Sequence, residues 1–121
     1  MGKFHIHQSA TAKFTFHLAA SNGETIATSQ AYASKESCKK GIESVKKNAP
    51  LAGIEDQTVE GSRAGHPKYE LYRDAADAFR FRLTATNGEN IIGSQAYASK
   101  ESCKKGIESV QANAPGAEVI E

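Results

Sequence analysis

Three histidines near the N-terminus have a spacing that can gather their imidazoles on one surface. His5 and His7 alternate with Phe4 and Ile6, so a strand at this position directs both imidazoles to the same face. His17 lies in the next alternating segment, and an antiparallel hairpin can place it opposite His5. Three imidazoles on one surface are suitable ligands for Zn²⁺ or Ni²⁺. The three histidines are therefore candidate metal ligands, and the alternative is a solvated strand face that tolerates many polar residues.

The corresponding segment of the second half carries different side chains. Arg80 and Arg82 alternate with apolar residues, and Tyr72 lies on the outward parity of the segment before them. Basic and aromatic groups on an open sheet face can hold single-stranded nucleic acid, because bases stack on aromatic rings. Tyr72, Arg80, Arg82 and His17 are the predicted binding residues of such a face. The alternative is again an ordinary solvated face, because the phenylalanines of these strands lie on the inward parity.

Cys38 and Cys103 are the only thiols of the chain. Cys38, Ile42 and Val45 follow the i, i+4, i+7 spacing of one apolar helix stripe, and Cys103 begins the same stripe in the second half. A redox or metal pair would need C-x-x-C spacing or an activating neighbour. We therefore expect both cysteines to be buried as small apolar side chains. Two cysteines, together with an N-terminal segment that has no apolar core, favour a reducing cytoplasm.

Charge and motifs argue against several classes of function. The chain has 15 basic and 14 acidic side chains, and the balance holds in each half, whereas nucleic-acid binding by bulk charge usually shows a basic excess. No apolar run approaches the roughly 20 residues that span a membrane. G-x-S-x-G, phosphate-loop and G-x-G-x-x-G signatures are absent, and no carboxylate falls on an inward position of the three strands before each helix or on a helix stripe. We therefore predict a protein that is not an enzyme, needs no cofactor and does not enter a membrane.

A 17-residue string, SQAYASKESCKKGIESV, occurs unchanged at residues 29–45 and 94–110. With the same offset of 65, residues 4–50 and 69–115 agree at 29 of 47 positions. A period this long, present twice, indicates two copies of one supersecondary unit. We predict a first unit over residues 1–60, a linker over 61–68 and a second unit over 69–121.

Each unit has the pattern of three strands, a helix and a short strand. Alternation predicts strands near residues 4–7, 14–18 and 25–30, and Asn22-Gly23 before the third predicts a type I′ hairpin turn. Ser34 is the expected helix N-cap. A strand near residues 54–59 completes the unit, with residues 119–120 as its counterpart. Gly41 costs a helix about 1 kcal/mol relative to Ala, and we expect it to let the helix approach the sheet.

The predicted fold is α+β, with two β-β-β-α-β repeats packed around a pseudo-two-fold axis and helices on one face of an antiparallel sheet. A unit of this size buries only about 60% of its unfolded surface and is marginal alone. We therefore expect one compact domain in which the halves share an interface. The chain would be a monomer with internal pseudo-dimer symmetry, and the first unit alone would be unfolded or dimeric.

These motifs together resemble the YegP-like family of small bacterial proteins, which are built from a domain of unknown function. The resemblance covers nearly all of both units. Four motifs carry it, each present twice: F-x-F-x-L at 14–18 and 79–83, N-G-E-x-I at 22–26 and 87–91, S-x-x-Y at 29–32 and 94–97, and K-G-I-x-S-V at 40–45 and 105–110. It implies an α+β fold with tandem or dimerised units, and it implies no catalytic residues.

The predicted function is that of a non-enzymatic cytoplasmic interaction or structural module with an unknown protein partner. The alternative is weak single-stranded nucleic-acid binding through the outer sheet face, ahead of a metal protein or an enzyme. Packing does not explain why exposed residues such as Lys40 are identical in both copies, whereas recent duplication or conversion between the copies can explain it without a functional demand, and the sequence does not decide between function and duplication. We therefore expect functional residues on the outward strand positions, where the copies differ.

Overall fold

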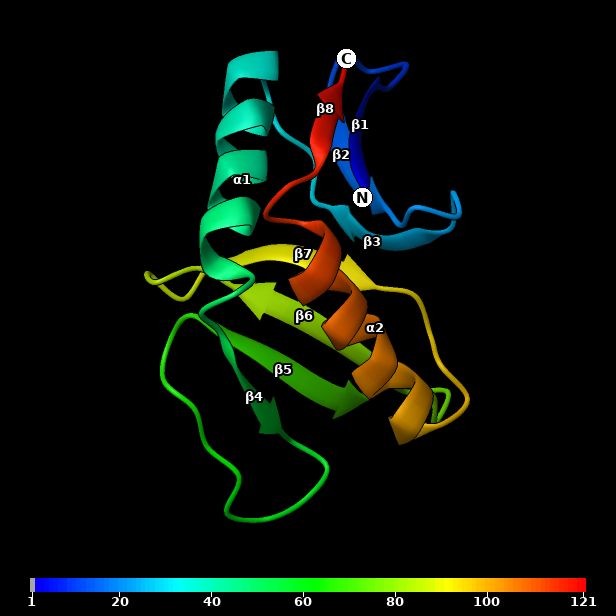
Figure 1. Cartoon of the computed structure of the whole chain (residues 1–121), viewed down its shortest axis with the longest axis vertical. Helices are drawn as coiled ribbons and strands as arrows, with labels where there is room; N and C mark the ends of the chain where they lie inside the picture. The colour runs from blue at the N-terminus through cyan, green and yellow to red at the C-terminus, as the bar shows by residue number, and fades with distance from the viewer. Residues whose placement is uncertain (1) are drawn as a thin grey trace.

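The computed structural model describes residues 2–121, and each half folds into three strands, a helix and a short strand (Figure 1). The order predicted from the sequence is therefore confirmed. The first half contains β1 (Lys3–Gln8), β2 (Phe14–Ala19), β3 (Thr25–Ser29), α1 (Lys35–Asn48) and β4 (Gly53–Asp56). The second contains β5 (Lys68–Arg73), β6 (Phe79–Thr84), β7 (Asn90–Ser94), α2 (Lys100–Asn113) and β8 (Glu118–Ile120).

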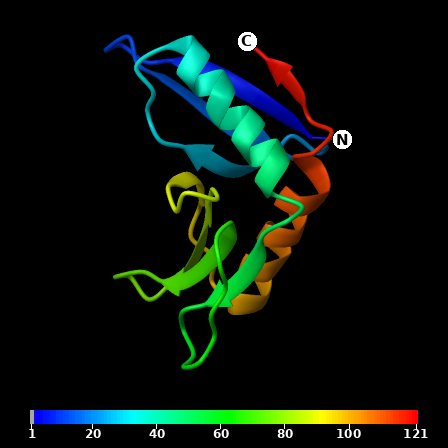
Figure 2. The ribbon, with the colours of Figure 1, turned by 90° about the vertical axis from the view of Figure 1, so that its left-hand side faces the viewer.

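All eight strands form one sheet in the order β4-β5-β6-β7-β3-β2-β1-β8. The two halves meet at the centre, where β3 pairs antiparallel with β7. The predicted α+β fold is confirmed, and the sheet is antiparallel except for its two outermost pairs, which are parallel. Each helix packs on its own half and on the central strand of the other half, α1 on β2 and β7 and α2 on β6 and β3. The C-terminal ends of the helices lie near each other at the middle of the molecule (Figures 1 and 2).

The fourth strand of each half pairs with the other half. β4 lies parallel to β5 with Ile54 opposite Tyr69, and β8 lies parallel to β1 with Val119 opposite Phe4. The sequence prediction that this strand completes its own unit is therefore corrected. The reason is the direction of the helix, because α1 ends close to the second half. Only residues 49–52 separate α1 from β4, and four residues span at most about 14 Å.

Side chains at both ends of the exchanged strands bind the two halves together. The Tyr69 hydroxyl donates a buried hydrogen bond of 2.8 Å to the Ala49 carbonyl, just beyond α1. Lys100 Nζ lies 2.9 Å from Asp56 of β4, and Lys35 Nζ lies 3.3 Å from Glu121 after β8. Burial opposes ionisation of Asp56, but hydrogen bonds from Thr58 and Lys100 outweigh it and lower its pKa to about 2. Each exchanged strand is thus held by hydrogen bonds along its length and by an ion pair at its end.

The core lies between the helices and the inward face of the sheet. Its sheet side is formed by alternate residues of the strands, and its helix side by the predicted stripes that begin at Cys38 and Cys103. The largest fully buried side chains are Phe4, Phe16, Leu18, Ile42, Val45, Tyr69, Leu71, Phe81, Leu83, Ile107 and Val110. Burial of both predicted helix stripes is therefore confirmed. No helix within residues 2–121 combines the length and hydrophobicity needed to cross a membrane.

Local signals in the sequence are confirmed in part. Ser34 caps α1 by accepting a hydrogen bond of 3.1 Å from the Ser37 N–H, as predicted. The β2–β3 connection is a three-residue loop rather than a type I′ turn, because only Gly23 has a positive φ, of 88°. Gly23 N–H donates to the Ala20 carbonyl, and the Asn22 side chain instead accepts from the Glu24 N–H. Asn-Gly therefore forms a type I turn followed by a glycine bulge, which is the next commonest hairpin connection.

The exchange predicts that residues 1–60 alone form a dimer. In the intact chain β1 pairs with β8 and β4 pairs with β5, so a fragment without the second half can satisfy both strands only by pairing β4 of one copy with β1 of another. Sedimentation equilibrium should give twice the fragment mass. Residues 1–52, which lack β4, should be unfolded. A well-folded monomer of residues 1–60 would contradict the exchange.

Candidate functional site

The three histidines of the first half gather on the outer sheet face as their spacing predicts. His5 pairs with His17 across β1 and β2, with ring centroids 4.8 Å apart and ring planes 19° from parallel. His7 Nε2 lies 2.7 Å from His17 Nδ1. Metal ligation needs imidazole nitrogens that converge within about 2.0–2.1 Å of one point, and within residues 2–121 no group of three His, Cys, Asp or Glu is so arranged. The metal site stays a prediction, and the near-parallel stacking of the three rings does not support it.

The stack makes protonation of His17 unfavourable. Partial burial lowers the pKa of His17 below 6.5, and charge repulsion from His7 and then His5 lowers it further. A histidine whose pKa is lower in the folded state than in the unfolded state contributes its full stabilisation above pH 6.5. This contribution is lost as the pH falls through the folded-state pKa.

His17→Gln should therefore make the stability less dependent on pH. Urea unfolding of both proteins at about pH 7.5 and about pH 5 checks this, because histidine changes charge in that interval. The native protein should lose more of its free energy of unfolding than the variant. The carboxylates contribute equally to both proteins and cancel in the comparison. Equal losses would show that the stack does not resist protonation.

The arginines predicted to bind nucleic acid already have partners. Arg82 donates to Glu70, and its guanidinium carbon lies 4.5 Å from the centroid of the Tyr72 ring. Arg80 Nε lies 2.7 Å from Asp74. A phosphate would have to compete with these carboxylates, and a base with Arg82 for the face of Tyr72. Binding of single-stranded nucleic acid at this face stays a prediction, and these contacts do not support it.

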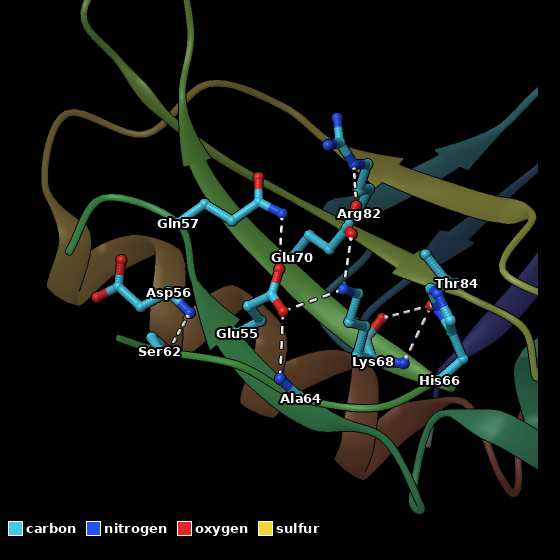
Figure 3. Close-up of polar contacts among 10 residues, drawn as sticks. All are labelled: Glu55, Asp56, Gln57, Ser62, Ala64, His66, Lys68, Glu70, Arg82 and Thr84. Carbon is cyan, nitrogen blue, oxygen red and sulfur yellow. Dashed lines mark hydrogen bonds and ion pairs between the residues drawn. The ribbon is translucent and has the colours of Figure 1, made fainter. Parts of the chain in front are cut away.

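Beside these arginines, the linker folds against the outer face around a charged network (Figure 3). Lys68 Nζ lies 3.0 Å from Glu55 and 3.2 Å from Glu70, and all three side chains are largely buried. Hydrogen bonds from Gln57, Lys68 and the Ala64 N–H lower the pKa of Glu55 to about 2. Each charge here is matched by a neighbour, and the network holds the linker in place.

Both cysteines are fully buried in the core, as predicted. Burial raises the pKa of Cys38, and burial followed by the Asp56 charge raises that of Cys103 to about 11. Reactive cysteines need a lowered pKa and access to solvent. Neither thiol therefore has the properties of a nucleophile.

Sequence reasoning missed two clefts that lie between the halves. The first has a volume of 260 Å³ and lies between α1, which contributes Lys40, and the β6–β7 hairpin, which contributes Glu89. The second has a volume of 280 Å³ and lies between α2, which contributes Lys105, and the β2–β3 hairpin, which contributes Glu24. The offset of 65 residues maps each lining residue of one cleft onto a lining residue of the other. The clefts are therefore equivalent under the pseudo-two-fold symmetry.

The lining of the two clefts is almost identical. Of the eleven lining positions, ten carry the same residue in both clefts, and only Thr25 and Asn90 differ. The outer sheet face behaves in the opposite way, because every predicted site position there differs between the halves: His5 and Glu70, His7 and Tyr72, Thr15 and Arg80, His17 and Arg82. The identical exposed residues of the repeated string were thus the signal for the clefts.

A tyrosine packed against a helical glycine forms one wall of each cleft. A Cβ at Gly41 would lie against the Tyr32 hydroxyl, 2.8 Å from the ring carbon Cζ and 3.1 Å from Phe16. Gly106 stands in the same relation to Tyr97. The sequence predicts that the glycine lets the helix approach the sheet. In the structure, the missing side chain mainly makes room for the tyrosine ring. Burial raises the pKa of Tyr32 above its usual value of 10.0, so its hydroxyl is neutral at neutral pH.

Gly41→Ala should therefore destabilise the protein although alanine favours helix. Overpacking costs about 1–3 kcal/mol, which exceeds the helical gain of about 1 kcal/mol. In a Tyr32→Ala background only the Phe16 ring, 3.1 Å away, has to shift, so the same change should cost clearly less than in the native background. Urea unfolding of the four proteins measures the coupling, and Gly106→Ala with Tyr97→Ala repeats it in the other half. An equal cost in both backgrounds would exclude the proposed contact.

Comparison with known proteins identifies the family. The domain of unknown function DUF1508 matches residues 9–56 and 74–121. The chain belongs to this family. The resemblance to YegP-like proteins is thereby confirmed, and each match begins within the first hairpin of its half.

Relatives share the sequence and the fold. A UPF0339 protein in the ptx operon 5′ region of Stutzerimonas stutzeri is 41% identical over 120 residues, which cover 99% of this chain and 96% of the relative. A UPF0339 protein of Treponema denticola is 56% identical over 54 residues, which cover 45% of this chain and 93% of that protein. The NMR structure of YegP from Escherichia coli, described as a protein of unknown function, has a TM-score of 0.81 at 38% identity and covers 98% of this chain and 90% of its own. These relatives indicate no specific function.

Proposed function

We propose that this protein is a non-enzymatic binding module that holds one small polar ligand in each of its two equivalent clefts. The observation that carries the proposal is the identity of ten of the eleven lining positions. Substitutions at exposed positions away from special features usually change stability by less than about 0.5 kcal/mol. Exposed cleft residues without a structural role would therefore drift, as the outer sheet face has.

Recent duplication does not fully account for this identity. Outside the repeated string, residues 4–28 agree with 69–93 at only 9 of 25 positions. Four of those nine positions line the clefts, at Ala20, Asn22, Glu24 and Ile26 and their counterparts. Asn22 serves the turn and Ile26 is buried, so these two have a structural reason to persist. Glu24 and Glu89 are exposed and form no ion pair within residues 2–121, and this supports ligand binding as the reason for their identity.

The side chains of the clefts suit binding better than catalysis. Neither cleft is lined by a histidine or a cysteine, the residue types that most often act as general base or nucleophile near neutral pH. What the clefts offer is hydroxyl and amide groups, one ammonium and one carboxylate. We place this binding in the cytoplasm, because two free thiols suit a reducing compartment. We further propose a monomer, because the strands exchange within one chain.

NMR of the ¹⁵N-labelled protein tests the binding function. Mixtures of small polar metabolites, including amino acids, sugars, nucleosides and carboxylic acids, are added to the full chain. A ligand should shift the amide signals of Gly41 and Glu89 at the first cleft and of Gly106 and Glu24 at the second, because the linings match. Shifts confined to the outer sheet face, or an absence of cleft shifts with every mixture, would contradict the proposal.

A further inference from the structure

We infer that each cleft takes a small zwitterion, namely a free α-amino acid or a molecule of similar size that carries one ammonium and one carboxylate. The inference rests on the binding function proposed above, and it adds the chemical class of the ligand. It comes from the charges of the two cleft walls, the size of the clefts and the neutral groups that line them.

The walls of each cleft carry opposite charges that do not meet. Lys40 stands on the helix wall and Glu89 on the facing hairpin wall of the first cleft, and Lys105 and Glu24 repeat this arrangement in the second. All four are exposed, and none forms an ion pair within residues 2–121. A ligand carboxylate at the lysine and a ligand ammonium at the glutamate would bridge the gap with two charge-assisted hydrogen bonds.

Some lysines of the same helices do meet carboxylates. On the same helices, Lys35 and Lys39 pair with Glu121, and Lys100 pairs with Asp56. Each of these lysines reaches a carboxylate on or just after an exchanged strand, whereas Lys40 and Lys105 face a hairpin carboxylate across an open cleft. A ligand with a single negative charge would meet attraction from the lysine and repulsion from the glutamate, so a zwitterion is the better complement.

The volumes and the neutral groups agree with a small ligand. At 260 and 280 Å³, both clefts fall below the range of about 300–1,000 Å³ that is usual for drug-sized ligands. Tyr32, Gln30 and the buried Ile91 also line the first cleft. The cleft can therefore offer neutral hydrogen-bonding groups and one apolar contact to the body of an amino acid.

Titrations of the full ¹⁵N-labelled chain with three related probes test the ligand class. L-alanine carries both charges, N-acetyl-L-alanine has lost the ammonium, and L-alanine amide has lost the carboxylate. L-alanine should shift the amide signals around both clefts. Each singly charged analogue should bind at least about tenfold more weakly, because a hydrogen bond to a charged group is lost.

The two clefts act as controls for each other. Glu89→Gln should weaken L-alanine binding at the first cleft by about tenfold or more and leave the second unchanged, and Glu24→Gln should do the reverse. Both substitutions keep the side-chain shape at exposed positions, and the unaltered cleft reports that the fold is intact. Glu108→Gln, on the exposed surface of α2 and outside both clefts, should change neither affinity.

The outcomes separate the ligand class from the binding function. If N-acetyl-L-alanine binds as tightly as L-alanine, the clefts take an anion and the zwitterion inference falls while the binding function stands. If none of the three probes shifts either cleft up to about 20 mM, where even a ligand with millimolar affinity would bind, the inference also falls. The metabolite mixtures then decide the binding function separately.

Discussion

The exchange of the last strand between the halves is the constraint on which the rest of the structure depends. β4 completes the sheet of the second half and β8 completes that of the first, so neither half has a full sheet without the other. The buried hydrogen bond from Tyr69 to Ala49 and the ion pair from Lys100 to Asp56 stabilise this arrangement. Two units that would each be marginal alone thereby share one continuous sheet and one core.

A second contact between the halves creates the clefts. Pairing of β3 with β7 at the centre places the hairpin of each half against the helix of the other. Because the pairing is symmetric, one sequence motif on the helix and one on the hairpin produce two copies of the same site. The glycine that admits Tyr32 or Tyr97 lies on the helix wall of each cleft, so the packing that forms the core also forms the wall of the site. In contrast, the outer sheet face forms no pair of equivalent clefts, and its residues differ between the halves.

Local patterns in the sequence were sufficient to predict the elements but not their partners. Alternation located β1, β2, β5 and β6, and it placed His5 opposite His17 because a short hairpin fixes the register. A strand pattern does not show which edge the strand joins, so the exchange of β4 was not predictable. The ion pair between Arg82 and Glu70 depends on pairing across β5 and β6, and solvent exposure alone did not reveal it. The clefts join segments about 50 residues apart in the first cleft and about 80 in the second, and duplication is a sufficient explanation of their signal, the identical exposed residues, when only the sequence is considered.

Native-state hydrogen exchange tests most directly whether the exchanged strands make the two halves one cooperative unit. The slowest amides of β2 and β6, one strand in each half, should open with the same free energy and the same dependence on denaturant, because neither half can unfold while the other keeps its sheet. If the amides of one half exchange at a clearly lower free energy while the other half stays protected, the halves are independent and the account is contradicted.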